Sequence, residues 1–74
     1  MEKLEGTVKI WNADQGFGFI ELPDAQDVFV HYSGIVAPHV RDLVVGQPVT
    51  FVMVQGARGW QAAGVEPKED EYHG

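Results

Sequence analysis

Residues 15–32 read QGFGFIELPDAQDVFVHY, and this stretch contains two alternating runs separated by a turn. In residues 17–22, and again in residues 28–31, the side-chain types alternate as they do in strands, where successive residues point to opposite faces. Between these runs, residues 23–26 read PDAQ, a composition typical of turns. The stretch therefore predicts a β-hairpin whose two faces differ in chemistry.

The register of this hairpin follows from the positions of its rings. Paired residues in an antiparallel ladder have a constant index sum, and a shift of one residue moves every side chain to the other face. An odd sum would mix rings with aliphatic side chains, whereas an even sum separates them onto two faces. The predicted pairs are Phe17 with His31, Phe19 with Phe29, and Ile20 with Val28.

The two faces can be assigned to core and solvent from the residues that extend them. The aliphatic face consists of Ile20, Leu22, Val28 and Val30, joined by Val8 and Ile10. The other face, which we call the ring face, consists of Phe17, Phe19, Phe29 and His31, and alternation adds Lys9, Trp11, Glu21 and Asp27 to it. Because charged side chains favour water, we expect the ring face to lie outside. The alternative is a sandwich in which these rings form the core.

The rest of the chain contains three more strand-like runs and no helical period. Residues 4–12 alternate, residues 49–55 are rich in β-branched side chains, and residues 61–66 form a short final run. Turn-forming residues occur at 13–16 and 56–59, whereas residues 33–47 are irregular. Five short strands in 74 residues predict one all-β domain, built as a small antiparallel barrel or sandwich.

Composition argues against several classes of function. The chain has no cysteine and three scattered histidines, so we expect no disulfide, no metal site and no cofactor. His31 and Ser33 share a strand face without a third orienting group, so we expect no enzymatic activity. The sequence has neither an apolar run of the roughly 20 residues that a membrane helix needs nor a signal-like N-terminus, and we expect a soluble, cytoplasmic protein.

The charge is unevenly placed along the chain. Eleven acidic residues against five basic ones give a net charge of −6, and residues 66–74 hold four of the acids and one of the bases. We expect residues 1–66 to form the domain and residues 67–74 to form a short, acidic, flexible tail. The remaining body is still mildly acidic, so a broad field of positive charge cannot be the main source of affinity for any ligand.

A contiguous patch of exposed rings marks a binding site more often than scattered apolar residues do. Rings beside Lys9, His31 and Arg58 suit a flat, anionic ligand with π faces, and single-stranded nucleic acid is such a ligand. Stacking reads a π face rather than a donor pattern, so we expect a mild preference for pyrimidine-rich strands. We expect neither a small-molecule substrate nor a membrane partner.

Four motifs resemble those of the cold-shock domain family. Residues 9–12 read KIWN, residues 16–20 read GFGFI and residues 28–31 read VFVH, which are similar to the start of that domain and its two ribonucleoprotein motifs. Residues 58–63, RGWQAA, resemble its last hairpin. The resemblance covers about residues 2–66. It implies a five-stranded antiparallel OB-type barrel, monomeric, that binds single-stranded RNA and DNA and acts as an RNA chaperone or antiterminator in bacterial cytoplasm.

The resemblance also implies site residues and shows departures from the family. It assigns nucleic-acid binding to Lys9, Trp11, Phe17, Phe19, Asp27, Phe29, His31, Tyr32, Arg58 and Gln61. Ile10 stands where the family usually has a stacking Trp, and alternation predicts that Ile10 leans inward and Trp11 outward. Gln15 stands where a Lys is common, and Val40 replaces a loop aromatic. Trp60 replaces a Pro beside Arg58, and we expect its ring to restore part of the lost stacking.

A second class of function remains open on the sequence. Val44, Val45 and Val52 stand where the resemblance leads us to expect acidic residues. If exposed, they lie beyond the ring face and form a contact for a protein partner. The alternative function is therefore an OB-type protein-interaction module that has lost most of its affinity for nucleic acid.

Overall fold

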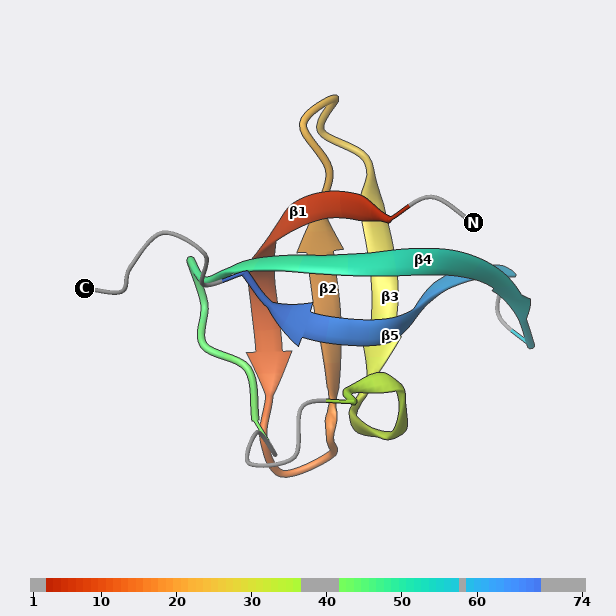
Figure 1. Ribbon diagram of the computed structural model, residues 1–74. Coiled ribbons are helices and arrows are strands. Elements are labelled where there is room, and N and C mark those ends of the chain that lie inside the picture. The colour runs from red at the N-terminus through yellow and green to blue at the C-terminus, as the bar shows by residue number, and fades with distance from the viewer. Residues whose placement is uncertain (1–2, 37–41, 58, 69–74) are drawn as a thin grey trace.

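The computed structural model of this chain describes residues 3–36, 42–57 and 59–68. The elements are β1 (Leu4–Asn12), β2 (Phe17–Glu21), β3 (Asp27–His31), the 3₁₀ helix η1 (Tyr32–Gly34), β4 (Pro48–Gly56) and β5 (Gly59–Pro67) (Figure 1). The five expected strands are thus confirmed. Within the described ranges, no helix is long and apolar enough to cross a membrane.

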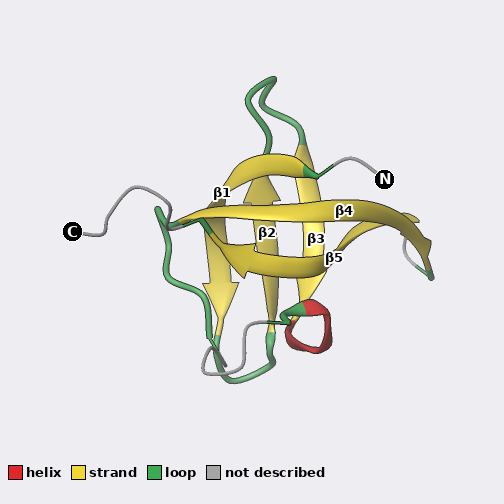
Figure 2. Cartoon of the chain, viewed as in Figure 1, coloured by secondary structure: helices red, strands yellow, loops and turns green. Residues whose placement is uncertain are grey.

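The strands close into a barrel in the order β1-β2-β3-β5-β4. Figure 2 shows β4 and β5 crossing in front of β2 and β3, with β1 bending from one layer into the other. Four of the neighbouring pairs are antiparallel, and the pair β3–β5 is parallel, with Phe29 beside Gln61. The expected OB-type barrel is confirmed, and this parallel contact is what closes it. Closure gives each of the five strands two neighbours, which reduces the sheet edge that could pair with another chain.

The predicted register of the β2–β3 hairpin is confirmed. Phe17 lies opposite His31, Phe19 opposite Phe29, and Ile20 opposite Val28. The ladder therefore sorts its side chains by chemistry, with rings on one face and aliphatic groups on the other, as the pleat requires.

The core is formed by the aliphatic face and by residues from β4, β5 and the segment before β4. Its members are at most 4% exposed: Val8, Ile20, Val28, Val30, Leu43, Val49, Phe51, Ala62 and Val65. Leu22 is half-buried and packs against this cluster. Phe51 is the one ring among these core residues, whereas the three phenylalanines of the ring face lie outside the cluster. The sandwich alternative, with those rings as core, is wrong.

A β-bulge in β1 overturns one prediction. Val8 lies opposite Ile20, but Ile10 lies opposite Phe19, so β1 carries one extra residue between these pairs. After the bulge Ile10 faces the same side as Phe19 and is 50% exposed, while Trp11 is half-buried against the core cluster. The expectation that Ile10 leans inward and Trp11 outward is therefore wrong, because alternation predicts faces only along an unbroken ladder.

Gly18 allows β1 to pass close to β2 at this point. A side-chain Cβ at position 18 would collide with the carbonyl group of Ile10 and approach the backbone of Trp11. The absence of a side chain there lets the two backbones meet, as at other strand glycines where another backbone approaches closely.

Strand pairing continues past the expected end of the domain. β5 runs to Pro67, and the Lys68 backbone N–H donates a hydrogen bond to the Pro48 carbonyl oxygen at 2.9 Å. Residues 69–74, which make up most of the expected tail, lie outside the described residues. The boundary between domain and tail therefore stays a prediction.

Candidate nucleic-acid interface

The ring face is built by two adjacent strands whose rings support one another. Phe17 and Phe29 have centroids 5.7 Å apart with an interplanar angle of 32°, and Phe19 meets Phe29 edge-on at 5.9 Å and 74°. These separations lie within the range of favourable aromatic pairs. All three rings are half-buried, so each is braced by a neighbour and still has surface open to solvent.

Tyr32 extends the ring face beyond the end of β3. Its ring centroid lies 4.6 Å from that of His31, and the residue is 57% exposed. Its backbone N–H donates to the Gly16 carbonyl at 2.8 Å, and a Cβ at Gly16 would run into the Tyr32 ring. Gly16 also has a φ of 76°, in the left-handed region that favours glycine. The turn after β1 therefore needs glycine here both for its conformation and for the position of Tyr32.

His31 is held by the residue two positions further along. The Ser33 backbone N–H donates to His31 Nδ1 at 3.2 Å, and the Ser33 hydroxyl oxygen lies 2.8 Å from the same nitrogen. These contacts cap η1 and fix the orientation of the imidazole. Because Nδ1 accepts, the neutral ring carries its hydrogen on Nε2.

Lys9 and Asp27 form an ion pair at the border of the ring face. Lys9 Nζ lies 3.2 Å from Asp27 Oδ2 and 3.4 Å from Oδ1, and both side chains are partly exposed. The other two lysines of the described residues also have carboxylate partners, Lys3 with Glu66 and Lys68 with Glu5. The described part of the surface therefore offers little uncompensated positive charge for phosphate groups.

Gln61 joins the ring face from β5, the strand next to β3 in the barrel. It lies beside Phe29 in the parallel β3–β5 contact. Its side chain passes over Gly56, where an added Cβ would collide with the Gln61 amide. The neighbouring Trp60 is 55% exposed, and the strand pleat directs it to the opposite side of the β4–β5 ribbon from Gln61. Its use as a stacking platform stays a prediction.

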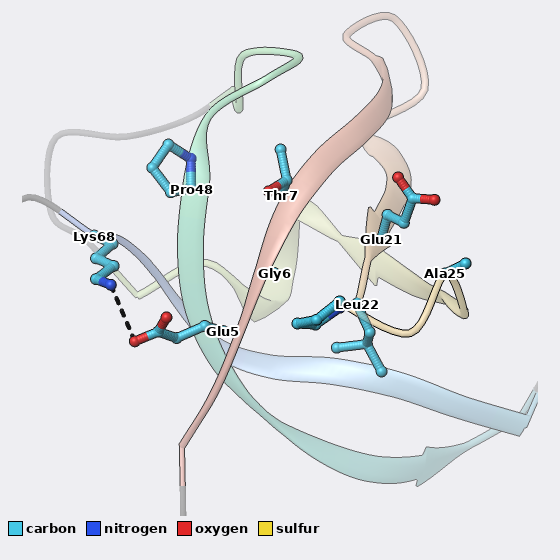
Figure 3. Close-up of a pocket in the computed structure, with 9 residues that line it drawn as sticks. Glu5, Gly6, Thr7, Glu21, Leu22, Ala25, Pro48 and Lys68 are labelled. Carbon is cyan, nitrogen blue, oxygen red and sulfur yellow. Dashed lines mark ion pairs between the residues drawn. The ribbon is translucent and has the colours of Figure 1, made fainter.

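A hollow of about 450 Å³ opens on the ring face. The residues that line it are Gln15, Phe17, Phe29, His31, Ser33, Ala57 and Gln61. A second hollow, of about 470 Å³, lies at the start of β1 and β4 and beside the β2–β3 turn (Figure 3). Its described lining includes Glu5, Glu21 and Lys68 but no aromatic residue, and Glu5 is paired with Lys68 at 3.1 Å. Acidic groups repel phosphate, so the hollow on the ring face is the better candidate for a nucleic-acid site.

The structure brings together most of the expected site residues. Lys9, Phe17, Phe19, Asp27, Phe29, His31, Tyr32 and Gln61 lie on or around the ring face. Trp11 is instead half-buried, and its indole N–H donates to Asp42 Oδ1 at 3.1 Å. Arg58 and Val40 lie outside the described residues.

Three residues of this surface were not expected to act there. Ile10 is exposed on the ring face because of the bulge, Gln15 lines the hollow, and Ser33 holds His31. The contact between His31 and Ser33 could have been predicted from the sequence, because a polar side chain often accepts a hydrogen bond from the backbone N–H two residues further along. The bulge left no comparable signal.

The fold and this surface define the class of protein. A closed, five-stranded, all-β barrel of this size is an OB-type barrel, with its binding candidates on the β2–β3 face. Residues 4–68 match the family model described as the 'Cold-shock' DNA-binding domain. Since that match covers most of the chain, the protein belongs to the cold-shock domain family.

Curated relatives agree with this assignment. The chain is 53% identical over 62 residues to "Cold shock protein CspC" of Bacillus subtilis (strain 168), covering 84% of this chain and 94% of that protein. It is 52% identical over 61 residues to "Cold shock protein CspA" of Staphylococcus aureus (strain USA300), covering 82% and 92%. A solved structure, "drosophila Unr CSD456", has a TM-score of 0.77 over 99% of this chain and 29% of that one, at 20% identity, and shows the same fold.

The described residues contain no cluster of three or more histidine or acidic side chains suited to a metal ion. The description of the family names DNA binding and no catalytic reaction.

Proposed function

We propose that this protein is a monomeric, cytoplasmic cold-shock protein that binds single-stranded RNA and DNA by stacking bases on the ring face. Membership of the cold-shock domain family supports nucleic acid as the ligand class. The observation that carries the proposal is the placement of Phe17, Phe19 and Phe29 outside the core, half-exposed and in mutual contact. Large rings are seldom left on a surface in this arrangement unless they bind something.

Stacking supplies the affinity in this proposal, and charge supplies little. Each base stacked on an aromatic side chain contributes about 1–3 kcal/mol. Three phenylalanines with His31 and Tyr32 therefore account for micromolar to nanomolar binding after the costs of ordering the strand. The Lys9–Asp27 ion pair limits the contribution from phosphate contacts. Pyrimidine-rich strands are preferred mildly, because stacking depends on base shape and strand flexibility more than on hydrogen-bond patterns.

The biological action we propose is that of an RNA chaperone or antiterminator. Bases held on the ring face cannot pair, so binding shifts the equilibrium of an RNA hairpin toward its open form. This action needs no ATP and forms no covalent bond. Duplexes bind poorly because their bases are already stacked on one another.

A protein-interaction module is the second candidate, and one observation favours it. Val44 and Val45, in the segment before β4, are 65% and 61% exposed. Val52, however, is half-buried in β4, so the three valines do not form one exposed patch. The ring face is larger and better organised, and we therefore prefer nucleic-acid binding.

A fluorescence titration with hexathymidine at low and moderate salt tests the proposal. The two tryptophans of the chain are Trp11 and Trp60, and Trp11→Phe and Trp60→Phe variants assign the signal to one indole or the other. We expect quenching with a micromolar or tighter dissociation constant. Absence of binding by an independent method, such as anisotropy of a labelled hexathymidine, would overturn the proposal and favour the protein-interaction module.

A further inference from the structure

The hollow on the ring face is lined by neutral polar groups. Beside Phe17 and Phe29 it is lined by two glutamines, Gln15 and Gln61, and the described residues of its lining include no lysine, arginine or carboxylate. Its volume of about 450 Å³ falls within the roughly 300–1,000 Å³ typical of small-ligand sites. A phosphate group would favour positive charge, and the described residues of this lining contribute neither a lysine nor an arginine.

Hydrogen bonds and strand pairing hold the backbone at both glutamines. The Gln15 N–H donates to Asn12 Oδ1 at 3.1 Å and the Gly16 N–H to the Asn12 carbonyl at 2.8 Å, so the turn that carries Gln15 is internally hydrogen-bonded. Gln61 is set by β5, with its side chain over Gly56 and its backbone beside Phe29. The two glutamines therefore line the same hollow from separate elements, Gln15 from the β1–β2 turn and Gln61 from β5.

His31 adds a hydrogen-bond donor to the same hollow. Its Nδ1 accepts from Ser33, so the neutral ring offers an Nε2–H donor. A glutamine amide supplies one donor group and one acceptor and can make two hydrogen bonds to a base edge. The hollow therefore combines aromatic rings, on which a base can stack, with glutamines and a histidine that can hydrogen-bond the edge of that base. This combination suits a nucleobase better than a phosphate.

We propose that Gln15 is a specificity-determining residue, whose amide hydrogen-bonds the edge of a base seated in this hollow between Gln15 and Gln61. This inference rests on the proposed function and adds to it that the protein discriminates among bases. Where a lysine would contact the backbone of any strand, Gln15 discriminates among bases and leaves the dependence of binding on salt unchanged.

The test compares Gln15→Ala and Gln15→Lys with the unaltered protein. Dissociation constants for labelled hexathymidine, hexadeoxycytidine and hexadeoxyadenosine are measured by anisotropy at several salt concentrations. We expect Gln15→Ala to narrow the ratio between the tightest and weakest oligonucleotide by about five- to tenfold, with an unchanged salt slope. Gln15→Lys should narrow that ratio equally and steepen the salt slope by about 0.7 through one new phosphate contact.

Gln26→Ala serves as the matched control, because Gln26 is an exposed glutamine in the β2–β3 turn, away from the hollow. It should change neither the ratio nor the slope. An unchanged ratio in Gln15→Ala, or an equal change in Gln26→Ala, overturns the role of Gln15 while leaving stacking intact. Failure of the unaltered protein to bind any of the three oligonucleotides overturns the proposed function itself.

Discussion

Ile10 lies opposite Phe19 in the β1–β2 ladder, although Val8, two residues earlier, lies opposite Ile20. The extra residue of the bulge turns Ile10 onto the ring face and turns Trp11 toward the core. Cross-strand neighbours on one face lie close enough to act on a shared ligand. The bulge therefore places an aliphatic side chain where one more stacking platform would fit.

Replacing Ile10 with Trp should tighten binding. The residue is 50% exposed beside Phe19, so an indole there gains a stacking surface without disturbing the core. We expect a gain of up to about 1–3 kcal/mol in binding free energy for hexathymidine, and little change in the melting temperature. An unchanged dissociation constant would show that the Phe19 side of the surface is not used by the ligand.

Truncating a ring of the ring face should weaken binding more than it weakens the fold. Phe17→Ala and Phe29→Ala should each lose about 1–3 kcal/mol of binding free energy, because each removes a stacking platform. Phe51→Ala is the contrasting variant, since Phe51 is fully buried and its loss should cost about 3–5 kcal/mol of folding stability. Thermal unfolding and titration of the same samples separate the two effects. A collapse of the melting temperature in Phe17→Ala would mean that this ring holds the barrel together.

Binding should depend only weakly on salt. For a single strand, the slope of log affinity against log salt concentration becomes more negative by about 0.7 for each phosphate contact. We expect one to three such contacts. The slope for hexathymidine should therefore lie near −1 to −2. A slope of about −5 or steeper would contradict an affinity that comes mainly from stacking.

Neutralising Asp27 should release Lys9 for a phosphate contact. The Asp27→Asn variant keeps the size and an acceptor oxygen but removes the charge that lies 3.2 Å from Lys9 Nζ. We expect the salt slope to steepen by about 0.7. The melting temperature should change little, because exposed ion pairs contribute about 0–1 kcal/mol.

Asp24→Asn provides the control for net charge. Asp24 is an exposed acid of the β2–β3 turn, whose side chain accepts from the Gln26 N–H, a contact that asparagine retains. It should leave the salt slope unchanged. An equal steepening in both variants would point to overall charge rather than to release of Lys9.

Several features were accessible from the sequence because strand geometry is local. Alternation along residues 17–22 and 28–31 predicted the hairpin register, the aliphatic core face and the outer position of the rings, and all three are confirmed. The pleat requires this, since a slip of one residue would bury rings and expose aliphatic side chains together. Two of the four family motifs, GFGFI at residues 16–20 and VFVH at residues 28–31, coincide with these two strands, so the resemblance and the alternation agree there.

The remaining features depend on how distant segments meet. The bulge that exposes Ile10 arises where the backbone of β1 passes close to Gly18 of β2. Alternation along the β1 sequence does not predict this bulge. Gln61 reaches the ring face through the parallel contact with Phe29, and Gln15 shares a hollow with it only because the barrel closes. The sequence by itself determined which side chains share a face of the hairpin, because the strand pleat acts over two residues. The tertiary structure alone decided which residues from β1, β5 and the turns surround that face, because barrel closure and bulges depend on backbone contacts between segments far apart in the chain.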